Sequence, residues 1–236
     1  HKDNVLLTID TSGSGLNKRG YRLAQGEAPI KETLAASLIR LANWKGDSPL
    51  IDPFCGSGTI AIEACLIAQN IAPGFNRDFV SEEWNIMPPN IYDELRDEAD
   101  RMADYDKEIE VYASDIDPEM VEIAKRNAEE VGLGDIIQFN VKDVNTLTID
   151  SEGPVALVGN PPYGERIGDR EEVEEMYRYI GSLMKQHPYL STYILTSNKE
   201  FEYLVNRKAT KRRKLFNGYI ECTYYQYWGK KPDFKN

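Results

Sequence analysis

Short apolar, β-rich runs alternate with amphipathic helical patterns along this 236-residue chain, and this alternation restricts its fold more than any other feature. Strands are expected at 48–54, 109–115, 135–141, 154–159 and 191–197, and helices at 59–69, 118–132 and 169–186. The run at 154–159 is continuously apolar, as expected of a parallel strand buried on both faces. Two more strands, around 213–218 and 221–229, are spaced like a hairpin. The pattern predicts an α/β, doubly wound, Rossmann-like domain with a mostly parallel seven-stranded sheet and an antiparallel C-terminal hairpin strand.

The domain organisation follows from two interruptions of this rhythm. An N-terminal helical extension, about 1–45, contains a helix pattern at 29–44 that is expected to pack near the first strand. An insertion, about 70–108, separates the first helix from the second strand and contains an acidic helix at 92–108. The sequence shows no internal repeat and no low-complexity linker. The whole chain, 1–236, is therefore expected to form a single domain.

Charge is distributed unevenly along the chain. The formal net charge is −11, which argues against a general nucleic-acid binder. Residues 78–110 hold twelve acidic and three basic side chains, whereas 207–214 holds six basic side chains and no acid. A local cationic surface can therefore coexist with the negative net charge of the chain. The candidates for phosphate contacts are Lys18, Arg19, Arg22, Arg166, Lys211, Arg212 and Arg213.

The cysteines and the hydropathy pattern exclude several classes. Cys55, Cys65 and Cys222 have no metal-site spacing, and with only two histidines no metal is expected. They are interpreted as reduced thiols of a cytoplasmic protein. No apolar run approaches the ~18 residues of a membrane span, and no signal peptide is recognisable.

The segment DPFCGSGT, residues 52–59, joins the first strand to the first helix of the alternating pattern. Gly56 and Gly58 allow a tight turn in which a ligand can approach the bare backbone. The helix that begins near Thr59 offers free N–H groups to a carboxylate or a phosphate. A dinucleotide fingerprint would require a further glycine where Ala61 stands, so a hydride-transferring dehydrogenase is disfavoured. The cofactor-binding candidates here are Asp52, Pro53, Phe54, Cys55, Gly56, Gly58 and Thr59.

Acidic side chains follow the next two strands. Asp115, followed by Ile116, is placed to accept hydrogen bonds from ribose hydroxyls. Asp143, followed by Val144, is placed to accept one from an adenine amino group, although each acid alone could also be a helix cap. With the glycine turn, they predict a nucleoside site whose third part binds a small anionic group. S-adenosylmethionine (SAM), with its adenine, ribose and amino-acid carboxylate, fits these three parts.

The segment GNPPYGER, residues 159–166, follows the buried apolar strand. Its two prolines make it extended and stiff, which fixes the directions of Asn160 and Tyr163. The Asn160 side-chain oxygen and the Pro161 carbonyl could accept the two N–H bonds of an aryl amine, and Tyr163 could stack on the base. The catalytic candidates are therefore Asn160, Pro161, Pro162 and Tyr163.

DPFCGSGT, ASDID and NPPYGER, in this order, resemble the motifs of class I methyltransferases that modify exocyclic amines. The closer resemblance is to the bacterial THUMP-domain group of RNA guanine-N(2) methyltransferases, often labelled adenine-N(6)-specific DNA methylases. SGSGLNKRGYR at 12–22 and LFNGYIECTYYQYWG at 215–229 extend the likeness over nearly the whole chain. The THUMP module of that group is absent from this sequence, which suggests a catalytic domain from a longer protein. The resemblance also implies that Glu32 and Thr33 lie beside the cofactor.

The expected function is thus SAM-dependent methylation of the exocyclic amine of guanine in RNA, with 23S rRNA as the expected substrate. Alternatives are methylation of adenine N(6) in RNA or DNA, of guanine N(2) in tRNA, or of a protein glutamine amide. An alternative from a different class is a non-catalytic RNA-binding assembly factor that retains SAM. The sequence does not fix the oligomeric state.

Overall fold

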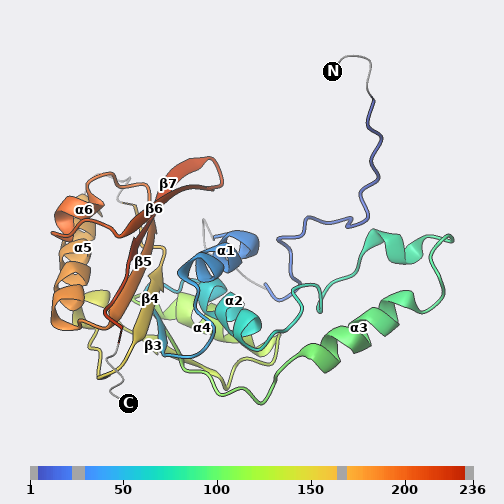
Figure 1. Cartoon of the computed structure of the whole chain (residues 1–236), viewed down its shortest axis with the longest axis horizontal. Coiled ribbons are helices and arrows are strands. Elements are labelled where there is room, and N and C mark those ends of the chain that lie inside the picture. The colour runs from blue at the N-terminus through green and yellow to red at the C-terminus, as the bar shows by residue number, and fades with distance from the viewer. Residues whose placement is uncertain (1–4, 23–29, 164–168, 232–236) are drawn as a thin grey trace.

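Seven strands form one sheet in the spatial order β3-β2-β1-β4-β5-β7-β6 (Figure 1). The computed structural model describes residues 5–22, 30–163 and 169–231. The strands are β1 Leu50–Asp52, β2 Val111–Asp115, β3 Ile137–Val141, β4 Val155–Gly159, β5 Leu190–Thr196, β6 Lys211–Asn217 and β7 Ile220–Tyr227. Strands β1 to β5 pair in parallel, whereas β7 lies antiparallel between β5 and β6. The predicted doubly wound α/β fold is confirmed.

Helices cover both faces of the sheet (Figure 1). The α-helices are α1 Glu32–Ala42, α2 Thr59–Ala68, α3 Ile91–Met102, α4 Pro118–Glu129, α5 Asp169–Gln186 and α6 Phe201–Leu204. Helices α1, α2 and α4 enclose one hydrophobic cluster against the sheet, and α5 and α6 enclose a second on the other face. Strand β4 is buried at every position because it lies between these two clusters.

The parallel register places the site-bearing segments at one edge of the sheet. Leu50 of β1 lies beside Val111 of β2 on one side and Ala156 of β4 on the other. The carboxyl ends of these central strands therefore meet at the same edge, where an open α/β sheet binds its ligand.

Arg77 makes most of the hydrogen bonds between the insertion and the N-terminal segment, and Ser81 adds two to the Thr11 carbonyl. Arg77 is buried, and its guanidinium donates to the carbonyl oxygens of Ser12 (2.9 Å), Ser14 (2.7 Å), Gly15 (3.0 Å) and Lys18 (3.3 Å). Its guanidinium carbon also lies 4.8 Å from the centre of the Phe79 ring. Helix α3 follows these contacts and buries none of its residues, which agrees with its acidic, solvated composition.

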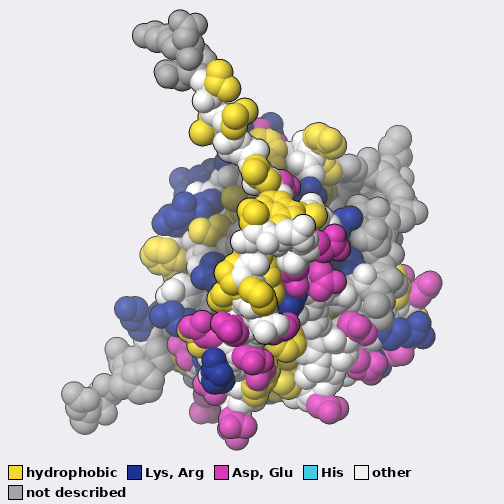
Figure 2. Space-filling model, turned by 90° about the vertical axis from the view of Figure 1, so that its right-hand side faces the viewer, with side chains coloured by type: hydrophobic (Ala, Val, Ile, Leu, Met, Phe, Trp, Pro, Cys, Tyr) yellow, Lys and Arg dark blue, Asp and Glu magenta, His cyan; other side chains and the backbone are white. Residues whose placement is uncertain are grey.

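The first described residues extend away from the body of the protein. Val5, Leu6, Leu7 and Ile9 are exposed. The surface view shows hydrophobic side chains spread along the extended segment, with polar and backbone atoms between them (Figure 2). None of the helices in the described part of the chain is both long and apolar enough to cross a bilayer.

Candidate active site

The DPFCGSGT segment forms a tight turn between β1 and α2. Gly56 and Gly58 have φ values of 50° and 85°, in the left-handed region that favours glycine. A Cβ on Gly58 would lie 3.0 Å from Cβ of Ala124, so this glycine also allows α2 to pack against α4. A Cβ on Gly56 would meet no atom of the described residues within 4 Å. The turn is therefore closely packed at Gly58 and open at Gly56.

Asp52 ends β1 directly beneath this turn and is fully buried. Its Oδ1 accepts a hydrogen bond from the Phe54 N–H (3.2 Å), whereas Oδ2 has no hydrogen-bond partner among the described residues. Burial raises the pKa of Asp52 from 3.8 to about 8; the Phe54 hydrogen bond opposes this rise and the Asp115 charge adds to it. A cationic group beside Oδ2 would supply the missing partner and favour the ionised carboxylate.

Asp115 connects the end of β2 to the glycine turn. Its Oδ2 accepts from the Gly56 N–H (2.9 Å), and its Oδ1 accepts from the Asp117 N–H (3.0 Å). Each carboxylate oxygen retains capacity for a further donor. Ile116, the next residue, is 68% exposed although it is a large apolar side chain. This edge of the sheet therefore offers hydrogen-bond acceptors beside an exposed apolar side chain, a combination that suits a nucleoside.

Asp143 lies after β3 and begins a short 3-10 helix, Val144–Thr146. Its Oδ1 accepts from the Asn145 N–H (2.9 Å), so it does act as a cap. Its Oδ2 accepts no hydrogen bond within the described part of the chain and remains available. Val144 is buried and packs into the cluster beneath α5.

Arg22 reaches the start of α2, a position that the sequence analysis did not foresee. Its Nη2 donates to Oγ1 of Thr59 (2.8 Å) and to the Ile30 carbonyl (2.8 Å), and its Nε lies 3.5 Å from Oε1 of Glu32. Within the described ranges no side chain caps α2, and the first turn of this helix contains no acidic residue. The guanidinium and the open helix terminus together make this corner attractive to an anion. Thr33, the neighbour of Glu32, is exposed.

The Asn160–Tyr163 corner lies at the end of β4, next to the glycine turn. A Cβ on Gly159 would lie 2.9 Å from a Phe54 ring carbon, so the absent side chain lets the DPF and NPPY segments touch. The Tyr163 hydroxyl donates to Oδ1 of Asn160 (2.7 Å) and accepts from Nδ2 of Asn217 (3.2 Å). The Tyr177 hydroxyl from α5 donates to the Pro162 carbonyl (3.2 Å). Pro161 is buried, and no described residue donates to its carbonyl.

The basic candidates separate into three groups. Arg19 and Arg22 are only 13% and 14% exposed, and Arg19 pairs with the buried Glu63 (3.2 Å). Lys18 is exposed, and so are Lys211, Arg212 and Arg213 of β6. Arg166 lies outside the described residues. The cationic groups that face solvent are therefore Lys18 and the β6 side chains, whereas Arg19 and Arg22 are held by internal carboxylates.

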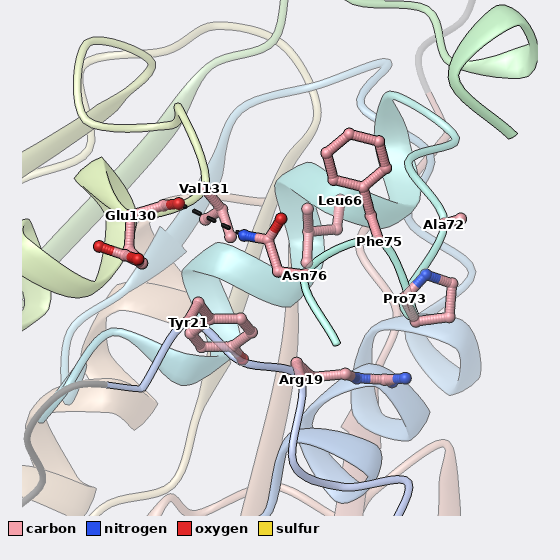
Figure 3. A pocket seen from close by; sticks show the side chains of 9 residues that line it. All are labelled: Arg19, Tyr21, Leu66, Ala72, Pro73, Phe75, Asn76, Glu130 and Val131. Atoms are coloured by element: carbon pink, nitrogen blue, oxygen red, sulfur yellow. Dashed lines mark hydrogen bonds between the residues drawn. The ribbon is translucent and has the colours of Figure 1, made fainter. Parts of the chain in front are cut away.

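A separate pocket of about 130 Å³ opens between the N-terminal segment, the loop after α2 and the end of α4 (Figure 3). Tyr21, Phe75 and Val131 contribute to its wall, and Asn76 donates to the Glu130 carbonyl (3.3 Å) across it. Leu66 and Val131 lie near the ends of helices that run back from the carboxyl edge of the sheet. The pocket is thus distinct from the glycine turn. Among the described residues, no group of His, Cys, Asp and Glu side chains is arranged to hold a metal ion.

Comparison with known proteins identifies the family. Residues 19–226 match the UPF0020 family, described as an RMKL-like methyltransferase domain. The chain belongs to the RMKL-like methyltransferase family. The match includes the glycine turn, both acidic strand ends, the Asn160–Tyr163 corner and all but the last residue of the β6–β7 hairpin.

Two curated relatives place the RMKL-like domain within longer proteins. It is 58% identical over 229 residues to the "Putative RNA methyltransferase YpsC" of Bacillus subtilis, covering 97% of this chain and 59% of that protein. It is 41% identical to the ribosomal RNA large subunit methyltransferase K/L of Shewanella baltica, covering 95% of this chain and 33% of that protein. The chain thus spans between one third and three fifths of these relatives.

Solved structures share the RMKL-like fold closely. SMU.472, crystallised with SAH, has a TM-score of 0.89 and 44% identity, covering 95% of this chain and 59% of that one. A predicted N6-adenine-specific DNA methylase from Listeria monocytogenes has a TM-score of 0.88 and 52% identity, covering 94% of this chain and 57% of that one.

Proposed function

We propose that this protein is a SAM-dependent RNA methyltransferase that modifies the exocyclic N2 amine of a guanine in large-subunit (23S) ribosomal RNA, in the cytoplasm. The observation that carries the proposal is the contact between the cofactor turn and the stiff Asn160–Tyr163 corner through Phe54 and Gly159. This contact supports the proposal because it brings the end of β4, which bears the proposed amine acceptors, next to the proposed SAM-binding turn. The names of YpsC and of the K/L relative support RNA as the substrate.

The residues at the carboxyl edge fit SAM part by part. The unpartnered Oδ2 of Asp52 would hold the ammonium of its amino-acid portion, and Arg22 with the start of α2 would hold the carboxylate. Asp115 would accept from the ribose hydroxyls, and Ile116 and Asp143 would contact the adenine. The open space beside Gly56 leaves room for the ligand at the turn. Bound in this way, SAM supplies an activated methyl group.

The corner acts on the target amine. An aryl amine is a weak nucleophile because its lone pair is delocalised into the ring. Acceptors at Asn160 Oδ1 and the Pro161 carbonyl would bind the two N–H bonds and favour the geometry in which the lone pair is freed. Tyr163 would stack on the base, a contact worth about 1–3 kcal/mol. No strong general base is needed because the nitrogen loses a proton readily once it is methylated, and alignment supplies most of the rate enhancement.

The β6–β7 hairpin provides the cationic surface for RNA. Lys211 and Arg213 are exposed and form no ion pair in the described part of the chain, whereas Arg212 pairs with Glu202 (3.3 Å). Phe216 and Tyr219, at the turn of the hairpin, are exposed aromatic side chains. Phosphates beside β6 and unpaired bases on the two rings would bring a flipped guanine to the neighbouring corner.

Methyl transfer from labelled SAM to unmodified ribosomal RNA tests the proposal in the full-length protein. We expect label on guanine, and we expect Asn160→Ala to abolish transfer while SAM and RNA binding persist. Label on adenine, tRNA or DNA alone would redirect the assignment to that substrate. Unchanged cellular function of the Asn160→Ala protein would instead identify a non-catalytic, SAM-retaining assembly factor.

A further inference from the structure

The Tyr163 hydroxyl lies where three polar groups converge, one from its own corner and two from the β6–β7 hairpin. It is 2.7 Å from Oδ1 of Asn160, 3.2 Å from Nδ2 of Asn217 and 3.5 Å from Sγ of Cys222. The last two residues belong to the β6–β7 hairpin, more than fifty positions along the chain. The ring itself packs against the hydrophobic cluster that includes Cys222. The hairpin therefore holds both the ring and the hydroxyl of Tyr163.

The direction of these hydrogen bonds is fixed by what each group can donate. The Asn217 amide nitrogen can only donate, so the Tyr163 hydroxyl accepts from it. The Cys222 thiol lies 3.5 Å from the same oxygen and 3.7 Å from the Ile220 carbonyl, and its one weakly donating proton can reach either. Burial raises the pKa of Tyr163 well above its usual range, so the hydroxyl keeps its proton. That single proton is donated to Oδ1 of Asn160.

This donation determines which end of the Asn160 amide faces the hydroxyl. An amide can turn by 180° and exchange its oxygen for its nitrogen. A donor from Tyr163 keeps the oxygen in place, and Oδ1 retains a second lone pair. Without that donor, the amide nitrogen could take the same position, where it would repel the N–H of an incoming amine.

We propose that Asn217 is a positioning residue for amine methylation: through Tyr163, it holds the Asn160 amide in the orientation that accepts the target amine. The inference rests on the proposed function, since it concerns the same site. Tyr177 donates to the Pro162 carbonyl and so supports the backbone of the corner. Asn217 instead donates to the Tyr163 hydroxyl and so orients the side chains of Tyr163 and Asn160.

The decisive substitution is Asn217→Asp in the full-length protein. Aspartate has nearly the same shape, but its carboxylate accepts hydrogen bonds and would draw the Tyr163 proton away from Asn160. We expect kcat for RNA methylation to fall about tenfold, with the dissociation constant for SAM and the melting temperature close to wild type. Asn217→Ala should reduce kcat less, because it removes a donor without adding a competing acceptor. Asn85→Asp, an exposed asparagine of the insertion with the same change of charge, is the matched control.

Coupling between the two residues separates positioning from a general structural effect. In a Tyr163→Phe background the hydroxyl is absent, so Asn217→Asp should lower kcat no further. Additive losses in the double variant, or an Asn217→Asp protein with wild-type kcat, would overturn the inference. A wild-type protein that transfers no methyl group to RNA would instead refute the proposed function.

Discussion

Gly56 and Gly58 have the same kind of backbone conformation but different surroundings. Both have positive φ, yet only the Cβ position of Gly58 is filled by α4. Gly58 is therefore required for packing as well as for the turn. Gly56 borders open space, where a ligand can approach the backbone.

Alanine substitutions should separate these two roles. Gly58→Ala should destabilise the protein by about 3 kcal/mol or more, because left-handed strain adds to the overlap with Ala124. Gly56→Ala carries only the conformational cost, about 1–2 kcal/mol, but its methyl group should reduce SAM affinity at least tenfold. Urea denaturation and calorimetric titration with SAM measure the two effects. Equal stability losses with unchanged SAM affinity would contradict these roles.

Asp52 links stability to pH because its pKa is high in the folded protein. Burial raises this pKa from 3.8 to about 8, so between these values the folded state holds a proton that the unfolded state has lost. The contribution of Asp52 to stability is complete below pH 4 and is lost as pH rises through 8. The slope over this interval is at most about 1.4 kcal/mol per pH unit.

Asn at position 52 should remove this dependence. Relative to wild type, Asp52→Asn should gain stability steadily from pH 4 to pH 8 and then level off. Thermal unfolding over pH 5–9 in the absence of SAM provides the measurement. A stability difference that does not change with pH would show that Asp52 has an ordinary pKa in the folded state.

At the scale of the elements, the alternating pattern was sufficient for the sheet and for most helices. The continuously apolar run at 154–159 forms β4, and the apolar stripe of 169–186 forms α5. A strand buried on both faces is apolar at every position, whereas a helix buried on one face has apolar residues at helical spacing. The acidic helix ends at Met102 rather than at 108, and α6 was not foreseen because four residues carry too little periodicity. The assignment of individual residues to the proposed active site remains a prediction.

Contacts between distant side chains could not be predicted. Arg22 and Thr59, or Tyr163 and Asn217, are joined only by the tertiary fold, and no spacing in the sequence marks them. The basic run at 207–214 was visible, but not which of its members would pair internally. The local sequence thus predicts the elements, whereas the side-chain partners at the site depend on how those elements pack.

Arg77 gives a testable contact between the insertion and the N-terminal segment. Arg77→Ala should release the carbonyl oxygens of Ser12, Ser14 and Gly15 and cost about 2–4 kcal/mol. Residues 12–18 should then exchange amide hydrogens and be cleaved by protease faster than in wild type. Arg101→Ala, on the exposed face of α3, is the control and should change neither measurement. Unchanged protection of 12–18 would mean that other contacts hold this segment.

At the scale of the whole molecule, a net charge of −11 coexists with an exposed cationic strand. For the proposed RNA substrate, long-range repulsion would therefore oppose binding, while short-range contacts at β6 would favour it. Added salt screens both the repulsion and the short-range contacts. For a single strand, however, the release of counterions from its phosphates dominates how affinity depends on salt concentration.

Two unpaired cations of β6 should account for part of the salt dependence. Lys211→Ala with Arg213→Ala should lower the slope of log affinity against log salt by about 1.4, since each phosphate contact on a single strand contributes about 0.7. Binding of an unstructured RNA at several salt concentrations measures the slope. An unchanged slope would exclude these two side chains as phosphate contacts.

The position of β7 in the sheet has a consequence for synthesis. Ribosomes make the glycine turn and the Asn160–Tyr163 corner before Asn217 and Cys222, yet β7 must enter the sheet between β5 and β6. A nascent chain that still lacks the hairpin would thus already contain the proposed SAM-binding residues, but its Asn160–Tyr163 corner would lack the contacts from Asn217 and Cys222. The proposed methyltransferase activity would then arise only after the hairpin has left the ribosomal exit tunnel.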